Sequence, residues 1–398
     1  MKRVALLCLG LALGAANAAE AQLTMQMSNG WSFTFAGNVN AFMIYKNSKT
    51  CDGDTCGAAA KDNSFGTGLL PAFAVFDAKG KEDNLDLGVH FGFAPQIETG
   101  GHYASFFGSQ AAGAQIDMRQ VYLTAGGTWG QLLMGKELGL FQRGNILNDM
   151  TLLGVGVGGG GRGTALGRIG YGYLYTDFRP QLTYSTPAGK STSFSVGLFE
   201  GIGAAQFSQL ELPRVEAEFT YSGKSGENTN FKFFVNGAAQ TAKDVTTDDN
   251  LSSTGVGGGA TVDISGFALH ASGFYAKGMG SLFMGDACCG TGDSRIASDG
   301  VDAAGDGRNS YGYIGQATYM KADSKWGLGA SWGENHLKPT DAEGDTELLK
   351  RRAIIGQITY KWSKSLRWVG EYGHIETFSG GTKDGKSDQG SLGMMLFF

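Results

Sequence analysis

The chain has little proline and, beyond its first residues, no long hydrophobic run. Proline accounts for only 6 of its 398 residues, so the high glycine content of 66 residues does not reflect a proline- and glycine-rich linker. After the N-terminal segment, no stretch reaches the ~18 consecutive apolar residues that an α-helix needs to cross a bilayer. Glycine at this level is also unfavourable to helices. Helical membrane proteins are therefore excluded, and one large β structure is expected.

Signals for catalysis, metal binding and nucleic-acid binding are also missing. The five histidines have no metal-binding spacing, and no nucleophile elbow, the strand–turn–helix setting of a catalytic serine, is recognisable. The glycine run at 158–161 lacks the Gly-Lys-Ser/Thr ending of a phosphate-binding loop. The formal net charge of −5 offers no basic excess for nucleic acid. The sequence therefore predicts no enzyme, no cofactor, no metal site and no nucleic-acid partner.

The N-terminus has the organisation of a secretory signal peptide. Lys2 and Arg3 precede an apolar run, which ends at the small-x-small cleavage signal Ala-Asn-Ala at 16–18. A second Ala-x-Ala follows directly, so the cleavage site is fixed only to within about three residues. We expect residues 1–18 to be removed after export. Residues 19–398 should form a single domain, because no linker, charge block or composition shift divides them.

Residues 31–45 alternate in a way that suits a membrane-spanning β-strand. Period-two alternation separates the segment into two faces. The first face consists of Trp31, Phe33, Phe35, Gly37, Val39, Ala41, Met43 and Tyr45. The second face is mostly small and polar, with Asn38 and Asn40 at its centre. The segment is long enough to cross a bilayer, but a soluble sandwich would place the same apolar face inside, so this segment alone leaves both possibilities open.

The same pattern recurs at 85–93, at 353–362 and in the last strand, 391–398. None of these apolar faces carries a charge, which on the lipid side at mid-bilayer would cost roughly 2–4 kcal/mol. Tight turns alternate with long polar connections, and about sixteen strands lie between them. The long connections are expected near 47–68, 95–113, 137–168, 201–212, 241–254, 278–309, 337–350 and 378–388. We therefore predict an all-β fold, a transmembrane antiparallel β-barrel, which leaves no free sheet edge.

Two segments resemble the Gram-negative general porins. They are AQIDMRQVYLTAGGTWGQLLMGKELGLFQ (114–142) and LGRIGYGYLYTDFRPQLTYSTPAGKSTSFSVGLF (167–199). The family pattern in the first is an Arg-containing strand, a Gly-x-x-Gly turn and a strand that ends in Leu-Gly-Arg. It matches at Arg119, Gly127, Gly130, Gly135 and Lys136, with lysine in place of the usual arginine.

The resemblance implies a sixteen-stranded homotrimer in the outer membrane of a Gram-negative bacterium, with the third loop folded into the lumen. The implied function is a water-filled channel through which small hydrophilic solutes and ions diffuse passively. Outer-membrane lipid and lipopolysaccharide would surround such a barrel.

The last strand resembles the signal that the barrel-assembly machinery reads during insertion. The pattern polar-x-Gly-x-x-apolar-x-aromatic matches at Ser391, Gly393, Leu396 and Phe398. We expect the last strand to close against the first, with Phe398 in an aromatic girdle at the periplasmic interface. The simpler alternative is that the last strand of any barrel ends in apolar residues.

Residues 137–168 form the candidate constriction loop, because they follow the strand after which the family places its pore loop. The loop is largely apolar, and its charged residues are Glu137, Arg143, Asp149, Arg162 and Arg168. Together with Arg119 and Lys136 from the preceding strands, these are the predicted pore-lining residues. The family usually sets an acidic loop against a cluster of arginines, and the slight basic excess of this loop departs from that pattern.

The basic excess favours small organic anions, such as aromatic or fatty carboxylates, as preferred solutes. The alternative is a glycine-rich loop that packs without selecting any solute. The position of Arg119 also has two interpretations. It shares strand parity with Val121 and Leu123, which should face outward, so either a bulge intervenes or Arg119 lies above the lipid band.

Four of the five cysteines lie in polar loops. Cys51 and Cys56 could form a disulfide in the first loop, because an exported chain meets an oxidising compartment; metal binding and free thiols are the alternatives. Cys288 and Cys289 are adjacent, which strains a mutual bond. The segment around them, 285–309, is rich in aspartate, but its spacing is not that of a calcium loop.

Two functions of other classes compete with the channel. A structural barrel or adhesin would act through its surface loops and have a plugged lumen. An outer-membrane hydrolase would need a serine–histidine pair at the bilayer rim, and we find none in the sequence. Conductance across a bilayer separates the adhesin from a channel, and an esterase assay separates the hydrolase.

Overall fold

A computed structural model describes residues 23–97, 116–158, 164–203, 206–281 and 299–398. The predicted signal peptide (1–18), Arg162 and the adjacent Cys288 and Cys289 lie outside these ranges. None of the helices in the described ranges has the length and apolar character to cross a membrane.

The described residues form one antiparallel sheet with two short helices between β8 and β9. The strands are β1 (Leu23–Gln26), β2 (Ser32–Asp52), β3 (Thr55–Cys56), β4 (Ala60–Gly66), β5 (Phe73–Glu82), β6 (Leu85–Pro95), β7 (Ile116–Gly127), β8 (Gly130–Leu138), β9 (Phe178–Ser185), β10 (Thr192–Phe199), β11 (Arg214–Ser225), β12 (Thr229–Lys243), β13 (Asn250–Ile264), β14 (Phe267–Lys277), β15 (Asn309–Tyr319), β16 (Trp326–Leu337), β17 (Leu349–Lys361), β18 (Leu366–Ser379) and β19 (Thr382–Phe397). The helices are α2 (Arg143–Leu147) and the 3-10 helix η1 (Met150–Leu153).

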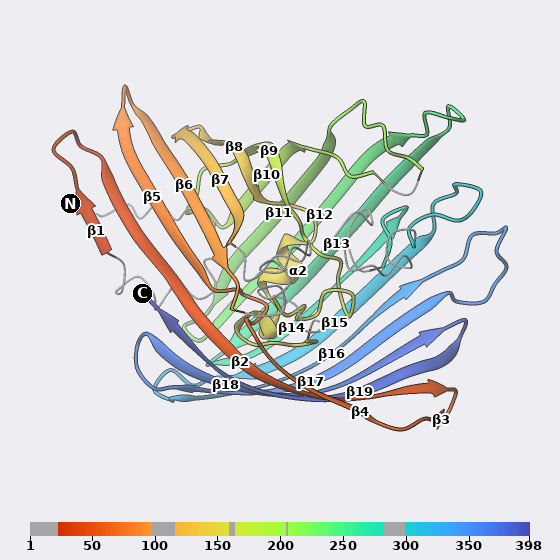
Figure 1. Cartoon of the computed structure of the whole chain (residues 1–398). Coiled ribbons are helices and arrows are strands. Elements are labelled where there is room, and N and C mark those ends of the chain that lie inside the picture. Colours follow the sequence, from red (N-terminus) through yellow and green to blue (C-terminus); the bar gives the residue numbers. More distant parts are fainter. Residues whose placement is uncertain (1–22, 98–115, 159–163, 204–205, 282–298) are drawn as a thin grey trace, which may run out of the picture.

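The sheet closes into a barrel because its last strand pairs with its first long one (Figure 1). β19 runs antiparallel to β2 from the Phe397–Asn38 pair to the Gly385–Thr50 pair. β4 and β5 pair with successive parts of β2 and act together as one interrupted wall strand. With that pair counted once and the short β1 and β3 set aside, the described residues form a wall of sixteen strands, which confirms the predicted number.

Side-chain burial confirms the predicted alternation. On β2, Val39 and Met43 are 56% and 49% exposed, whereas Asn38 and Asn40 are almost fully buried. The outer face of the barrel is therefore apolar and the inner face is polar, the reverse of a soluble sandwich. An apolar band around the outside is what a bilayer requires of a barrel.

Several predicted loops are shorter than expected, because the strands continue beyond the apolar band. The segment 241–254 was expected to be a loop, but only residues 244–249 separate β12 from β13. Likewise, within 378–388, Gly380 and Gly381 alone separate β18 from β19. Above the lipid both faces of a strand meet water, so the apolar alternation that marks a strand fades there.

A small hairpin closed by a disulfide caps the end of β2. β3 pairs with β2 so that Cys51 lies opposite Cys56, and these two residues form a disulfide with their Cα atoms 4.0 Å apart. The Gly53 N–H at the tip of the hairpin donates to the Lys383 carbonyl of β19 (3.0 Å). The hairpin is therefore held beside the start of β19.

The last residues close the barrel at its short-turn end. The Phe398 N–H donates to the Gly37 carbonyl (3.0 Å), and the Gly37 N–H donates to the Phe398 carbonyl (2.8 Å). The rings of Phe398 and Phe35 lie 5.3 Å apart. At Gly393 an added Cβ would lie 2.3 Å from Phe42 Cδ1, so glycine is required there by packing alone.

Replacing Phe398 by aspartate is expected to lower the amount of folded barrel in the outer membrane. The change removes an aromatic pair worth roughly 0.5–1.5 kcal/mol and adds a carboxylate where the strands meet. Heat-modifiable mobility of membrane fractions on a gel measures the folded fraction. Met394→Leu, on the same outer face, is the control and should insert normally; wild-type amounts of folded Phe398→Asp would contradict the prediction.

Candidate functional site

Between β8 and β9 the structure describes residues 139–158 and 164–177, which lie inside the barrel and are called the inner loop below. Helix α2 stands within the ring of strands (Figure 1) and contacts β12 and β13. The predicted loop, 137–168, began slightly early, because Glu137 and Leu138 still belong to β8.

Two glutamates on the inner face of the wall bind the backbone of the inner loop. Glu216 on β11 accepts hydrogen bonds from the N–H groups of residues 140–141, at 2.6 and 2.9 Å. Glu371 on β18 accepts from the N–H groups of residues 155–156, at 2.7 and 2.8 Å. Irregular backbone has no ladder partner, and a buried N–H without an acceptor is costly. The wall carboxylates supply that acceptor.

Amide side chains on the wall satisfy both donors and acceptors of the loop. Gln316 on β15, Asn335 on β16 and Gln389 on β19 each accept from one loop N–H and donate to one loop carbonyl, at 2.5–3.3 Å. The backbone groups that they contact belong to residues 148–150, 156–158 and 172–173. An amide suits this task because it carries a donor and an acceptor on one side chain.

The wall itself turns inward to meet the loop at the break between β4 and β5. The Leu69 N–H donates to the Gly154 carbonyl (2.8 Å), and the Ala165 N–H donates to the Thr67 carbonyl (3.2 Å). Asn40 on β2 supports this turn through its side-chain amide. The inner loop is therefore hydrogen-bonded to the wall from β11 through β19 to the broken second strand.

Apolar packing fixes the parts of the inner loop between these contacts. Five of its apolar side chains are fully buried: Leu140, Phe141, Val155, Tyr173 and Leu174. Four of them belong to one apolar cluster with wall residues such as Phe42 and Phe274. The loop thus has a core of its own inside the barrel.

Two of the predicted pore-lining residues, Arg143 and Asp149, bind partners inside the packed region between the inner loop and the wall. The Arg143 guanidinium binds the Glu218 carboxylate of β11 through Nη2 (2.6 Å), and both side chains are mostly buried. Asp149 accepts from the Tyr173 hydroxyl (2.6 Å) and from the Thr151 N–H (2.8 Å) at the start of η1. Burial raises the pKa of Asp149 above its ordinary value, against the opposing effect of these hydrogen bonds. Neither group offers a free charge to the lumen.

Arg168 is fully buried between the loop and the wall. It donates to the Ala353 carbonyl of β17 (2.5 Å) and to the Ser331 hydroxyl of β16. Burial lowers the pKa of Arg168 to about 10, so the guanidinium stays charged at neutral pH, with Asp149 favouring that charge. Arg168 therefore attaches the inner loop to the wall and does not face solutes.

Lys136 and Glu137 lie on opposite faces of β8. Glu137 is buried inside, where the Gln120 amide donates to it (2.8 Å). Lys136 shares the outer face with Met134, and its ammonium donates to the Met118 carbonyl (3.1 Å). The prediction that Lys136 lines the pore is therefore wrong, because strict alternation places it outside the barrel.

Arg119 faces inward because of a β-bulge. The pairing of β6 with β7 shifts register between Gly92 and Phe93, which leaves Arg119 as the extra residue of β7. Its guanidinium pairs with Asp117 (2.8 Å) and reaches the Thr164 hydroxyl of the inner loop (3.4 Å). The bulge is thus the correct one of the two interpretations of Arg119.

A second arginine, which the sequence reasoning missed, lies in the same surroundings. Arg179 on β9 pairs with Asp177 (2.7 Å). Together with the Asp117–Arg119 pair they are called the Asp-x-Arg group (Asp117, Arg119, Asp177, Arg179), and the four side chains are 19–44% exposed. They surround the buried Tyr175, whose pKa burial raises to about 12. The Asp-x-Arg motif occurs at 117–119 and again at 177–179, and this repetition could have predicted the group from the sequence.

The described part of the chain brings no three His, Cys, Asp or Glu side chains close enough together to hold a metal ion. The site is therefore built from backbone hydrogen bonds, apolar packing and a small set of paired charges.

Solved structures share this architecture. The outer membrane channel DcaP of Acinetobacter baumannii is 16% identical, with 94% of this chain and 99% of that chain covered and a TM-score of 0.65. The anion-selective porin from Comamonas acidovorans is 13% identical, with 92% and 100% covered and a TM-score of 0.61. OmpF of Salmonella typhi is 15% identical, with 94% and 100% covered and a TM-score of 0.54. At these identities the likeness concerns the fold.

The family comparison goes further than the fold. No curated protein matches the chain, but the family model of the Gram-negative porins matches residues 5–379. That match spans nearly the whole chain and agrees with the closed sixteen-stranded barrel. The chain therefore belongs to the Gram-negative porins, outer-membrane channels through which small solutes diffuse passively.

Proposed function

We propose that the channel is water-filled and that the inner loop forms its constriction. The observation that carries this proposal is the set of wall side chains, Glu216 and Glu371 above all, which hold the loop backbone inside the barrel. A loop fixed in this way narrows the lumen permanently. Solutes and ions would then be sorted by size and by the charges that remain accessible beside the loop.

A preference for small organic anions is the second candidate. It rests on the Asp-x-Arg group, which includes Arg119 from the predicted residues and adds Arg179. Glu216 and Glu371 bind backbone N–H groups, and Glu218 binds Arg143, so these acids present little free negative charge. The Asp-x-Arg group stays partly exposed, and the planar guanidinium matches a carboxylate in two parallel hydrogen bonds. A carboxylate solute would compete there with Asp117 and Asp177.

Assembly of the channel follows the family resemblance. We propose that residues 1–18 are cleaved on export, that the barrel-assembly machinery reads the Ser391–Phe398 pattern, and that the barrel forms a homotrimer in contact with lipopolysaccharide. One similar structure, OmpT of Vibrio cholerae in its trimer form, supports the oligomer at 14% identity and a TM-score of 0.53, with 93% of this chain and 100% of that chain covered.

Replacing Glu371 by alanine is expected to free the inner loop near 155–156 and to raise single-channel conductance. Two hydrogen bonds to a charged acceptor are lost, each worth roughly 1.5–3 kcal/mol. Conductance and current noise in a planar bilayer measure the effect. Asp86→Ala is the control, because Asp86 makes only an exposed ion pair with Lys81 (3.7 Å) near the β5–β6 turn. Wild-type conductance in Glu371→Ala would show that this part of the loop is not the constriction.

Replacing both Arg119 and Arg179 by glutamine is expected to shift the reversal potential in a salt gradient towards cations. Asp117 and Asp177 would keep their charges without partners, and a fixed charge acts on ions within about 8–10 Å at moderate salt. Lys136→Gln removes a positive charge from the outer face and should leave the reversal potential unchanged. An unchanged potential in the double variant would remove the Asp-x-Arg group from the selectivity mechanism.

A further inference from the structure

The Asp-x-Arg group carries two charges of each sign and is neutral as a whole. In each pair the aspartate binds the Nε atom of its arginine, at 2.8 Å between Asp117 and Arg119 and at 2.7 Å between Asp177 and Arg179. A guanidinium has five N–H donors, so the two Nη groups of each arginine remain for other acceptors. Within the described ranges they make one hydrogen bond, a long one from Arg119 to the Thr164 hydroxyl (3.4 Å). Both arginines can therefore still bind a carboxylate.

The carboxylates of this region are at least as accessible as the guanidiniums. Asp117 is 44% exposed, and its Oδ1 atom has no hydrogen-bond partner in the part of the chain that the structure describes. Asp117 points inward, because it lies opposite the buried Ala94 in the sheet register. Glu200 is 60% exposed and lies 4.0 Å from Arg179 Nη1. By comparison, Arg119 and Arg179 are 19% and 22% exposed.

The next arginine along the wall does not change this balance. Arg214 on β11 is fully buried and binds Glu216 through Nε (2.8 Å). A simple organic anion would be attracted by the two accessible guanidiniums and repelled by Asp117, Asp177 and Glu200. A solute that carries both charges avoids this repulsion, because its positive group can bind a carboxylate of the wall while its negative group binds an arginine.

We propose that the Asp-x-Arg group binds zwitterionic solutes of the α-amino acid class. The solute carboxylate would accept two parallel hydrogen bonds from the Nη groups of Arg119, and the solute ammonium would donate to Asp117 Oδ1. An α-amino acid carries both groups on one carbon atom, so it matches a pair whose own charges are in contact at 2.8 Å. The proposal rests on the water-filled channel proposed above. It narrows the second candidate from carboxylates in general to carboxylates that also carry an ammonium group.

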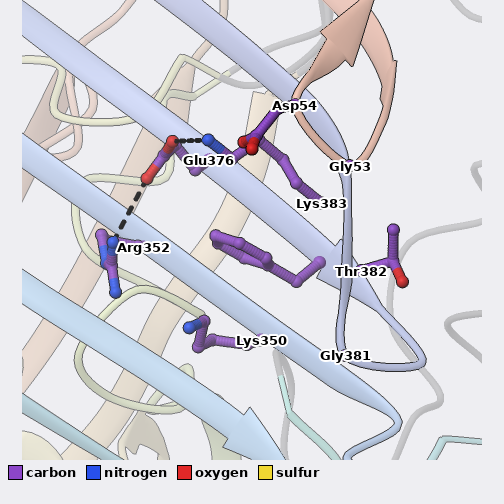
Figure 2. A pocket seen from close by; sticks show the side chains of 9 residues that line it. Gly53, Asp54, Lys350, Arg352, Glu376, Gly381, Thr382 and Lys383 are labelled. Atoms are coloured by element: carbon purple, nitrogen blue, oxygen red, sulfur yellow. Dashed lines mark hydrogen bonds and ion pairs between the residues drawn. The ribbon is translucent and has the colours of Figure 1, made fainter.

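A second cluster of mixed charge, on the outer face of the barrel, offers a matched control. Figure 2 shows Glu376 of β18 between Arg352 and Lys383, which it binds at 3.4 and 2.6 Å. Glu376 has the opposite strand parity to Glu371, which binds the inner loop. The cluster therefore faces away from the lumen, and its charges do not contact a solute inside the channel.

The test compares leucine with two analogues that each lack one of its charged groups. Isocaproate lacks the ammonium, and isoamylamine lacks the carboxylate. Block of single-channel current through the purified full-length channel in a planar bilayer gives a dissociation constant for each compound. Leucine should bind about threefold to fivefold more tightly than either analogue, because each analogue loses one partly exposed ion pair.

Variants separate the roles of the two charges. D117N/D177N removes partners of the ammonium and should reverse the order, so that isocaproate binds more tightly than leucine. R119Q/R179Q should weaken the binding of both leucine and isocaproate and should not weaken that of isoamylamine. E376Q removes a carboxylate that also binds an arginine, but on the outer face, and should keep the order of the wild type. Heat-modifiable mobility on a gel checks that each variant is folded.

Two results would overturn the proposal. One is equal binding of leucine and isocaproate by the wild type, or tighter binding of isocaproate, which would favour a channel for simple organic anions. The other is an unchanged order of binding in folded D117N/D177N. Saturation-transfer NMR with the purified protein in detergent repeats the comparison without conduction. A wild type that binds leucine in this measurement but conducts no ions would contradict the channel function and leave the amino-acid site standing.

Discussion

The hydrogen bonds of the inner-loop backbone are the constraint on which the rest of the structure depends. Irregular backbone enclosed by a barrel wall must find a partner for each N–H and C=O group. The wall meets this need with carboxylates and amides that point inward at intervals around the ring, such as Glu216, Gln316 and Glu371. The need for hydrogen-bond partners also affects the electric field in the lumen. A carboxylate that accepts from a loop N–H contributes less to the field across the lumen than a carboxylate without such a partner.

Because side chains alternate along a strand, the same strand carries inward side chains that bind the inner loop and outward side chains that form ion pairs on the outside of the barrel. On β18, Glu371 faces inward and binds the loop, whereas Glu376 faces outward and orders Lys383 and Arg352. Five positions along one strand are enough to move a side chain from the inner face of the wall to its outer face. A one-residue shift in register would exchange these roles along the whole strand, so the register of the last strands decides which side chains meet the inner loop and which lie outside the barrel.

The sequence allowed the wall to be predicted and the inner loop only in part. The wall strands could be recognised from alternations such as Val39 with Asn40, because a strand face in contact with lipid must be apolar. Strand ends at the rim, such as those joined by Gly380 and Gly381, were missed because water surrounds both of their faces. The outward position of Lys136 follows from alternation along β8 and could have been predicted. The inward position of Arg119 needed a bulge, which depends on the partner strand. The burial of Arg168 needed the tertiary contact with Ala353 and had no local signal.

The break between β4 and β5 makes this part of the wall depend on the inner loop. The Leu69 and Leu70 N–H groups and the Thr67 carbonyl find their backbone partners in residues 152–165, almost a hundred positions later in the chain. The wall segment 67–70 and the inner loop therefore stabilise each other. Any change that displaced the loop would leave these wall groups without hydrogen-bond partners, so the loop supports the barrel wall as well as filling part of its interior.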